Sequence, residues 1–330
     1  MATTTAFSED PLVVASRGSR LARTQAEIVV DLLRARHPEL KIEVETVRTS
    51  GDSDPRPFAE IGGKGLFTSE VERSVVEGRA HVAVHSAKDL TAELAPGCDI
   101  VCVPARAARA DVVVGGRGRS GEERLGALEP GATVGTSSTR RRALLTEARP
   151  DLDVVEFRGN LDTRLAKVRD GAVGVAILAA AGIERLHRGQ DVSQPDAAPL
   201  DPSWWVPAPA QGALAIEARA DRPDVAALFE GLTDPGSRAE VACERAFSAR
   251  LEGGCSVPLG CTAVVSGANL TATGYLATPD AAIALRDRIS GSAAEAASLG
   301  TELAEALLAA GGDEVLDEIR ASEMTEPSAP

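Results

Sequence analysis

The stretch LVVASRGSRLARTQAEIVVDLLRAR, residues 12–36, contains a strand, a turn and a helix in immediate succession. LVVAS (12–16) is a short apolar run of the kind that forms a buried strand. The run 19–36 places its apolar residues near helical spacing, and Ser19 is suited to cap the helix. A strand that leads into an amphipathic helix is the repeating unit of α/β proteins with a mostly parallel sheet.

The same alternation continues along the chain to about residue 219, which predicts an α/β fold in two blocks. Strands are expected at 41–48, 80–86, 111–115, 132–137, 152–157, 172–179 and 212–219. Helices are expected at 65–78, 138–148 and 159–170, with a short helix or turn at GIERL. Two such blocks are typical of paired lobes with a ligand cleft between them. The Pro- and Asp-rich run 189–210 is predicted to be a long loop or a crossing between domains.

The pattern changes from about residue 232 and predicts a small α+β domain. One helix, 237–250, precedes three strand-like runs that favour an antiparallel sheet, and an Ala/Leu-rich helix follows. The three runs are 260–266, 269–277 and 282–290, and the last helix is expected at 292–311. The final ten residues, ASEMTEPSAP, are expected to be disordered.

Composition narrows the class of protein. Of 330 residues, 44% are hydrophobic and 25% charged, which is ordinary for a globular protein of two or three domains. No apolar run approaches the roughly 18–20 residues of a membrane span. The N-terminal residues resemble neither a secretory signal nor a transit peptide, so we expect a cytoplasmic protein. Its five cysteines include no CxxC pair, and neither disulfides nor a metal site is expected.

The net charge of −14 argues against a nucleic-acid partner, but the charge is unevenly spread. Residues 131–190 hold ten basic and seven acidic side chains, whereas residues 231–330 hold six basic and fifteen acidic ones. An acidic protein with one basic segment predicts a confined site for an anionic ligand.

The most informative basic cluster is GTSSTRRRALLTEAR, 135–149, where Ser137 or Ser138 precedes a helix that begins with Arg140, Arg141 and Arg142. Cations are disfavoured at a helix N-terminus by roughly 0.3–1 kcal/mol because the helix dipole is positive there. Their presence is explained if they hold a carboxylate or phosphate together with the free backbone N–H groups. The structural alternative is a solvated basic face.

Three further helix starts are suited to bind an anion, and in open α/β sheets they lie at the carboxyl ends of strands, where ligands bind. Each motif is weak alone. The candidate residues at these three helix starts are Arg17 and Ser19 in SRGSRLA, Lys64 in GGKGLF, and Arg158 and Arg164 in FRGNLDTR.

HSAKDL, 85–90, follows the predicted strand 80–86 and offers Lys88 and Asp89 at its carboxyl end. An acid there is suited to general acid/base work or to stabilising a cationic intermediate, and equally to capping a turn. His81 and His85 would lie about 13 Å apart on one strand, at ~3.3 Å per residue, and are interpreted as structural. Cys98 and Cys102 lie in an apolar strand-like run and are interpreted as buried thiols.

Several of these motifs together resemble one family. The order VVASRGSRLARTQAEIV, GGKGLFTSEVE, AVHSAKDL, GTSSTRRRALL, FRGNLDTRLAKV, AAAGIERL, PAPAQGALAIEAR and RLEGGCSVPLG is similar to that of the porphobilinogen deaminases, also called hydroxymethylbilane synthases. The resemblance implies two lobes like those of periplasmic binding proteins plus a small α+β domain. It implies a lobe of residues 1–104 and 213–230 with the catalytic aspartate, a second lobe of 105–212 with the arginine-rich site, and a domain of 231–330 with the cofactor cysteine.

The resemblance also implies a reaction. Members of this family are transferases that join four porphobilinogen molecules head to tail, release ammonia and yield the linear tetrapyrrole hydroxymethylbilane, in heme biosynthesis. They work on a covalent dipyrromethane primer, which a cysteine holds through a thioether. The implied partners are the small-molecule substrate alone, with no nucleic acid and no membrane, and the enzyme is expected to be a monomer.

Carried onto this sequence, the resemblance makes Cys255, in the Gly-rich loop LEGGCSVPLG, the anchor of the cofactor and Asp89 the catalytic residue. Bidentate arginines suit repeated carboxylate recognition, and each substrate unit carries two carboxylates. The residues implied to bind the cofactor are Lys64, Lys88, Ser138, Arg140, Arg141, Arg158 and Arg164. Those implied to bind substrate are Arg17, Ser19, Arg158, Arg164 and Arg185.

Two other function classes fit parts of the pattern. A non-catalytic two-lobed binding protein for a small anion would share the fold, but it needs no cysteine loop. A cysteine-nucleophile acyl transferase would use Cys255 as its nucleophile, but no histidine lies near Cys255 in the sequence.

Overall fold

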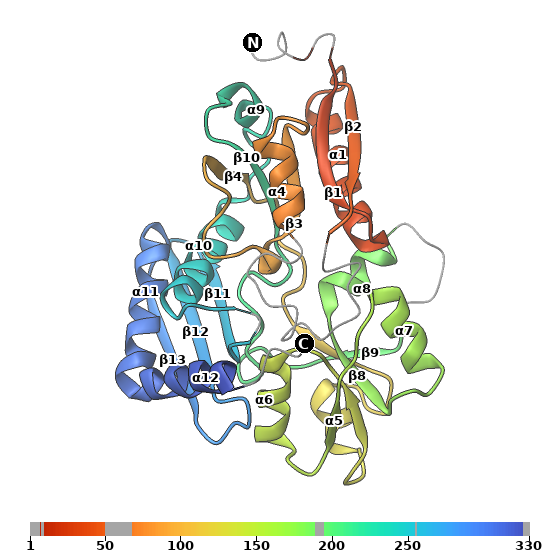
Figure 1. The fold of residues 1–330 in the computed structure, drawn as a ribbon, viewed down its shortest axis with the longest axis vertical. Coiled ribbons are helices and arrows are strands. Elements are labelled where there is room, and N and C mark those ends of the chain that lie inside the picture. The colour runs from red at the N-terminus through yellow and green to blue at the C-terminus, as the bar shows by residue number, and fades with distance from the viewer. Residues whose placement is uncertain (1–6, 8–9, 50–67, 189–194, 255, 326–330) are drawn as a thin grey trace. The chain divides into compact units, whose positions relative to one another are not determined.

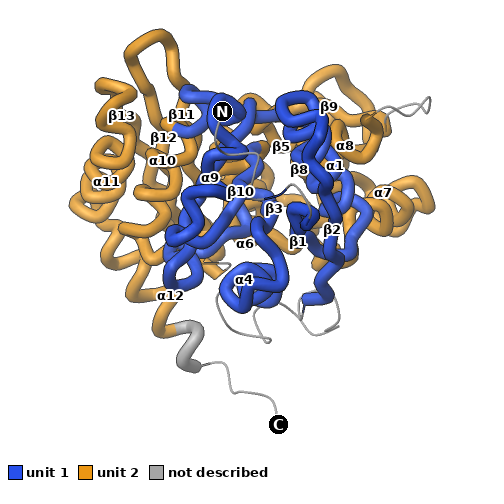
Figure 2. Tube along the Cα trace, turned by 90° about the horizontal axis from the view of Figure 1, so that it is seen from above, with its two compact units in different colours: residues 1–107, 213–238 blue, residues 108–212, 239–330 orange. Residues whose placement is uncertain are grey.

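The computed structural model describes residues 7, 10–49, 68–188, 195–254 and 256–325. The chain divides into two compact units, drawn in different colours in Figure 2. Unit 1 comprises residues 1–107 and 213–238, and unit 2 comprises residues 108–212 and 239–330. The chain therefore crosses between the units three times. The finer division into three domains with the boundaries given above remains a prediction.

Unit 1 is built on a five-stranded sheet of order β2-β1-β3-β10-β4 (Figure 1). Its strands are β1 (Leu12–Arg17), β2 (Ile42–Val47), β3 (Val82–Ser86), β4 (Cys98–Cys102) and β10 (Leu214–Arg219). The first three are parallel, so their carboxyl ends meet at one edge, while β10 runs antiparallel between β3 and β4. That edge carries the candidate residues of unit 1.

The helices of unit 1 follow the predicted amphipathic patterns. α1 (Arg20–Arg36) begins at Ser19, whose hydroxyl accepts a hydrogen bond from the Ala22 N–H, and it buries Ala26, Val29 and Leu33 against the sheet. Among its described residues, the other helices are α4 (Ser69–Val76), the 3₁₀ turn η1 (Ala87–Asp89) and the short α9 (Pro223–Ala227). Ser19 therefore caps the helix as the sequence predicted.

Unit 2 contains a second five-stranded sheet of the same type, with order β7-β6-β8-β5-β9. Its strands are β5 (Asp111–Val114), β6 (Thr133–Gly135), β7 (Asp153–Val155), β8 (Val175–Ala179) and β9 (Ala197–Pro199). β6, β7 and β8 are parallel, and β5 is antiparallel to β8. The helices are α5 (Gly121–Gly126), α6 (Thr139–Ala148), α7 (Leu161–Arg169) and α8 (Ala180–Leu186). The last three follow the parallel strands, so they begin at one edge of the sheet.

The rest of unit 2 is an antiparallel sheet of order β11-β12-β13 with helices packed on it. Its elements are β11 (Leu259–Ser266), β12 (Asn269–Ala277), β13 (Ala284–Ser292), α10 (Pro235–Arg250, whose first turn belongs to unit 1), α11 (Ala296–Leu307) and α12 (Asp313–Thr325). Phe247, Leu270 and Leu303 are buried in its core, one from a helix before the sheet, one from the sheet and one from α11.

The predicted fold class, two α/β lobes and a small α+β domain, is confirmed by these three sheets. Two predictions about local structure were wrong in part. The run 189–210 was predicted to be a long loop or a crossing between domains; residues 189–194 lie outside the described residues, but β9 lies within the rest of the run and pairs with β5. The last ten residues were predicted to be disordered, but α12 extends to Thr325 and includes the first five of them, while residues 326–330 lie outside the described residues. The short helices α5 and α9 were not predicted, because neither has enough turns to show a periodicity. None of the described helices has both the length and the apolarity to cross a membrane.

Candidate functional site

In unit 1 the carboxyl edge of the sheet brings together four of the predicted site residues. Arg17 ends β1 and Ser19 caps α1, while Lys88 and Asp89 lie in η1 directly after β3. β1 and β3 are adjacent parallel strands, so the two turns lie at the same edge. Asp89 is half-buried and Lys88 is exposed.

The turn that carries Asp89 is held by two hydrogen bonds, at Ser86 and at Ala87. The Gln25 amide on α1 donates a hydrogen bond to the Ser86 hydroxyl at 2.8 Å. The Ala87 N–H donates to the Ala213 carbonyl at 3.0 Å. These contacts hold the start of the turn to a helix and to the segment before β10, so the backbone that leads to Asp89 is fixed.

The predicted structural role of the two histidines agrees with their surroundings. His81 accepts a hydrogen bond from the Val13 N–H through Nδ1, and burial, with the charge of Arg222 second, lowers its pKa. His85 is buried, and its Nε2 lies 3.1 Å from Oε2 of Glu217 on β10. No group of three metal-ligating side chains occurs in the part of the chain that the structure describes.

In unit 2 the carboxyl edge of the parallel strands gathers the predicted arginine cluster. Ser138 caps α6 by accepting a hydrogen bond from the Arg141 N–H, so Ser138 rather than Ser137 is the cap. Arg158 follows β7, and its Nε lies 3.4 Å from the Glu156 carboxylate. The remaining predicted residues of this unit are Arg140 and Arg141 in α6, Arg164 in α7, and Arg185, which lies in the last turn of α8 and not at its start.

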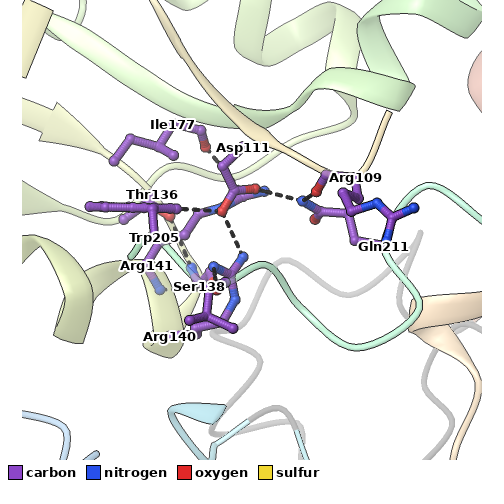
Figure 3. Close-up of polar contacts among 10 residues, drawn as sticks. Arg109, Asp111, Thr136, Ser138, Arg140, Arg141, Ile177, Trp205 and Gln211 are labelled. Atoms are coloured by element: carbon purple, nitrogen blue, oxygen red, sulfur yellow. Dashed lines mark hydrogen bonds and ion pairs between the residues drawn. The ribbon is translucent and has the colours of Figure 1, made fainter. Parts of the chain in front are cut away.

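Arg140 and Arg141 are buried and share one carboxylate, that of Asp111 at the start of β5 (Figure 3). Nη2 of Arg140 lies 2.8 Å from Oδ2 of Asp111, and Nη2 of Arg141 lies 2.6 Å from Oδ1. Their Nη1 groups donate to the Val206 and Ile177 carbonyls. The sequence predicted that these cations meet an anion at the helix start, and the anion present within the chain is Asp111.

Asp111 accepts two further hydrogen bonds, from the Trp205 indole at 2.9 Å and the Gln211 amide at 2.8 Å. Burial alone would raise the pKa of this carboxyl, but the charges of Arg140 and Arg141 and the hydrogen bonds of Arg141 and Gln211 outweigh it and hold the pKa well below its usual range. Sequence reasoning missed Asp111, Trp205 and Gln211. The signal available was a lone acid directly before the apolar run VVV.

This buried group keeps an excess of positive charge, since two guanidinium groups face one carboxylate. The Nε atoms of both Arg140 and Arg141 are buried and have no hydrogen-bond partner within the described structure. Burial also lowers the pKa of Arg185 to about 10, and its guanidinium donates a hydrogen bond to the Gly212 carbonyl at 2.7 Å. Unmatched buried cations favour an anionic ligand, so these residues fit the carboxylates of a dipyrromethane.

We expect Asp111→Asn to destabilise unit 2 by about 3–5 kcal/mol, because it leaves two buried guanidinium groups without a carboxylate. Since the folded pKa of Asp111 is lowered, its contribution is present above the unfolded pKa of about 3.9 and is lost as the pH falls through the folded value. Urea unfolding between pH 3 and 7, followed by tryptophan fluorescence, measures both effects. The control is Asp153→Asn, which removes an exposed carboxylate of β7. Equal stability of the two variants at pH 7 would contradict the role of Asp111.

Cys255 and Lys64 lie outside the described residues, and so do residues 50–67 around Lys64. The residues before Cys255 are described and form a helix-ending motif. The Glu252 N–H donates to the Ala249 carbonyl and the Gly253 N–H to the Ser248 carbonyl, which is the Schellman pattern. Glu252 occupies the left-handed conformation, with φ 52°, that usually falls to glycine. The described residues directly before Cys255 therefore form a tightly fixed turn at the end of α10.

The four described cysteines are buried, and none of them forms a disulfide with another. Burial, with the nearby Glu217 and Glu244 carboxylates respectively, raises the pKa of Cys98 and of Cys243 to about 12. Burial likewise raises the pKa of Cys102. Thiols held in the protonated form are poor nucleophiles, so these three are unsuited to form a thioether.

Comparisons with known proteins identify the family of the chain. A family model described as "Porphobilinogen deaminase, dipyromethane cofactor binding domain" matches residues 12–227, and one described as "Porphobilinogen deaminase, C-terminal domain" matches residues 238–309. The porphobilinogen deaminase of Roseiflexus castenholzii is 42% identical over 306 residues, which cover 92% of this chain and 98% of that protein. That of Trichlorobacter lovleyi is 40% identical over 309 residues, which cover 93% and 96%.

Similar solved structures include the periplasmic aliphatic sulphonate binding protein SsuA from Escherichia coli, at 15% identity and a TM-score of 0.36, covering 74% of this chain and 71% of that one. YhfZ from Shigella flexneri is 15% identical with a TM-score of 0.34, covering 77% and 96%. The two family models together extend over most of the sequence, and the relatives match it nearly from end to end. This chain belongs to the porphobilinogen deaminase family.

Proposed function

We propose that the chain carries out its family's reaction with Asp89 as the catalytic carboxylate, Cys255 as the covalent anchor of the cofactor and the arginines at the two sheet edges as carboxylate ligands. The family relationship gives the activity: the enzyme is a hydroxymethylbilane synthase, a transferase that joins four porphobilinogen molecules into a linear tetrapyrrole and releases ammonia. The alternative of a non-catalytic anion-binding protein is not favoured, because both domains of the enzyme family match.

The observation that carries the assignment of the arginines is the unmatched buried charge at α6. Two guanidinium groups share Asp111, and each retains a partnerless Nε–H. We propose that Arg140 and Arg141, with Ser138 at the same helix start, hold carboxylates of the cofactor. Arg158 and Arg164, which follow the neighbouring strand β7, are proposed to bind cofactor and substrate side chains, and Lys64 and Lys88 are proposed as further cofactor contacts.

Asp89 is proposed to stabilise positive charge on the substrate. Loss of the amine from porphobilinogen leaves an azafulvenium-like cation, and a carboxylate placed near the pyrrole nitrogens lowers the energy of that cation. The same carboxylate is suited to take up the ring proton whose removal restores aromaticity after coupling. Arg17, Ser19 and Arg185 are proposed to hold the substrate carboxylates, so that the leaving amine and Asp89 keep a fixed geometry. The dipyrromethane, when bound, supplies the pyrrole position to which the first unit is joined.

Intact mass spectrometry before and after addition of porphobilinogen tests the proposal. The purified protein is expected to carry a covalent increment of two pyrroles, and brief exposure to substrate is expected to add a ladder of one-pyrrole steps. A purified, folded protein that carries no such increment would remove the covalent anchor from the assignment. The monomeric state and the cytoplasmic location remain proposals, which size-exclusion chromatography and cell fractionation can check.

A further inference from the structure

The segment of Trp205, Val206 and Pro207, which we name the 205–207 segment, is part of the buried group around Arg140. Trp205 and Val206 are fully buried in a core that also contains Leu144 of α6. The Trp205 indole donates to Asp111 at 2.9 Å (Figure 3). Arg140 Nη1 donates to the Val206 carbonyl at 2.8 Å. One side of this segment is therefore held by the arginine cluster.

The other side of the 205–207 segment is held by the start of β11. The Cys261 N–H donates to the Pro207 carbonyl at 2.9 Å. Gly260 lies so close that a Cβ added there would be 2.7 Å from the Val206 oxygen and 3.0 Å from the Pro207 oxygen. Such an approach requires a residue without a side chain. β11 is the strand that follows the loop with Cys255, so one short segment contacts both the arginine cluster and the strand after that loop.

A second set of contacts ties the same sheet to α6. Gly260 is paired in register with Tyr275 of β12, whose ring is fully buried in the core that contains Trp205 and Leu144. Arg286 of β13 lies with its guanidinium 4.7 Å from the Tyr275 ring centroid and forms a two-fold ion pair with Glu147 at 2.6 and 2.7 Å. The antiparallel sheet is thus attached to the second half of the arginine-bearing helix, through Leu144 and Glu147.

We propose that the 205–207 segment and Gly260 form a positioning element, which sets the arginine pair at a fixed separation from the loop that holds the cofactor. The inference rests on the proposed function, since it takes Cys255 as the anchor of the cofactor and Arg140 and Arg141 as ligands of its carboxylates. A group that is tethered at one point and bound at another needs a fixed distance between the two points. A displacement of about 1 Å can lower the rate of a reaction ~10²-fold. None of these residues contacts the reacting atoms in this proposal.

Gly260→Ala tests the element from the side of the loop. The added methyl group must push β11 away from the Val206 and Pro207 carbonyls. Among folded molecules isolated by size exclusion, we expect a smaller fraction with the covalent two-pyrrole increment. In the molecules that carry it, we expect kcat to fall by about 10–100-fold with KM changed less than about twofold. The matched control is Gly126→Ala, where a Cβ meets nothing within 4 Å and both measurements should equal those of the unaltered enzyme.

Trp205→Phe tests the element from the side of the arginines and keeps the proposal testable if Gly260→Ala does not fold. It removes one hydrogen bond to Asp111 while a smaller aromatic ring still occupies most of the space in the core, so the variant is expected to fold. As for Gly260→Ala, we expect kcat to fall while KM stays nearly unchanged, and the fall in kcat should be smaller. A role in stability alone would lower the yield of folded protein but leave kcat per cofactor-bearing molecule unchanged, and that result would overturn the proposal. An unaltered protein without the covalent increment would instead overturn the proposed function.

Discussion

Asp89→Asn is expected to lower the turnover of porphobilinogen by about 10²–10⁴-fold while the fold and the covalent cofactor are retained. The amide has nearly the shape of the carboxylate but cannot carry its negative charge. It therefore neither stabilises a cationic substrate intermediate nor accepts the ring proton. The turn that carries the residue is held through Ser86 and Ala87, and neither contact involves the Asp89 side chain. The loss should accordingly appear in kcat, with the two-pyrrole mass increment unchanged.

The matched control for Asp89 is Asp99→Asn, which removes an exposed carboxylate from β4 of the same unit. Its turnover should equal that of the unaltered enzyme, so that a general effect of net charge is separated from the effect at the site. Single-turnover measurements on protein that carries its cofactor would show whether the coupling step itself is slowed. Turnover of Asp89→Asn within a few-fold of the control would take the catalytic role away from this residue.

The elements that could be predicted from the sequence are those whose pattern is local. The run 12–36 contains the apolar strand, the cap at Ser19 and the helical spacing of α1 within one window, and the structure follows it closely. Strand direction is not a local property, because the alternation of side chains is the same in both directions. For that reason β10 looked like one more strand of a mostly parallel sheet, whereas it is antiparallel to both of its neighbours.

The same distinction applies to the candidate site. Arg140 and Arg141 could be identified because cations in the first turn of a helix oppose its dipole, which is a local signal. Their carboxylate partner could not be identified, since Asp111 is 29 and 30 residues away and is brought to them only by the pairing of β5 with β8. The sequence therefore predicted that the arginines need an anion but did not show that the chain supplies one. A second anion, the proposed ligand, is inferred because two guanidinium groups face only one carboxylate, which leaves one positive charge unmatched.

The local distribution of charge also explains how a protein with a negative net charge can bind anionic ligands. With a net charge of −14, the chain as a whole repels a carboxylate-rich product, so attraction must be confined to the sheet edges. Burying Arg140 and Arg141 achieves this, because a guanidinium away from water interacts more strongly with a carboxylate than an exposed one does. The carboxylate of Asp111 offsets part of the free-energy cost of burying two guanidinium groups, and one positive charge remains for the ligand.

Cys255→Ser is expected to yield folded protein without the covalent cofactor and with no measurable formation of hydroxymethylbilane. A serine hydroxyl is a far weaker nucleophile than a thiolate, so the thioether is not replaced by an ether. Intact mass spectrometry should show the mass of the bare chain, and urea unfolding should show whether unit 2 has lost the stabilisation that a bound anion gives to Arg140 and Arg141.

The control for Cys255 is Cys98→Ala, because Cys98 is a free thiol that burial, together with the neighbouring Glu217, keeps protonated, with a pKa raised to about 12. This variant should retain the two-pyrrole increment and its activity, apart from the small cost of a buried cavity. The two results together separate attachment at one thiol from attachment at any thiol. A two-pyrrole increment on Cys255→Ser would show that another side chain holds the cofactor, and the fixed turn at Glu252 and Gly253 would then need a different explanation.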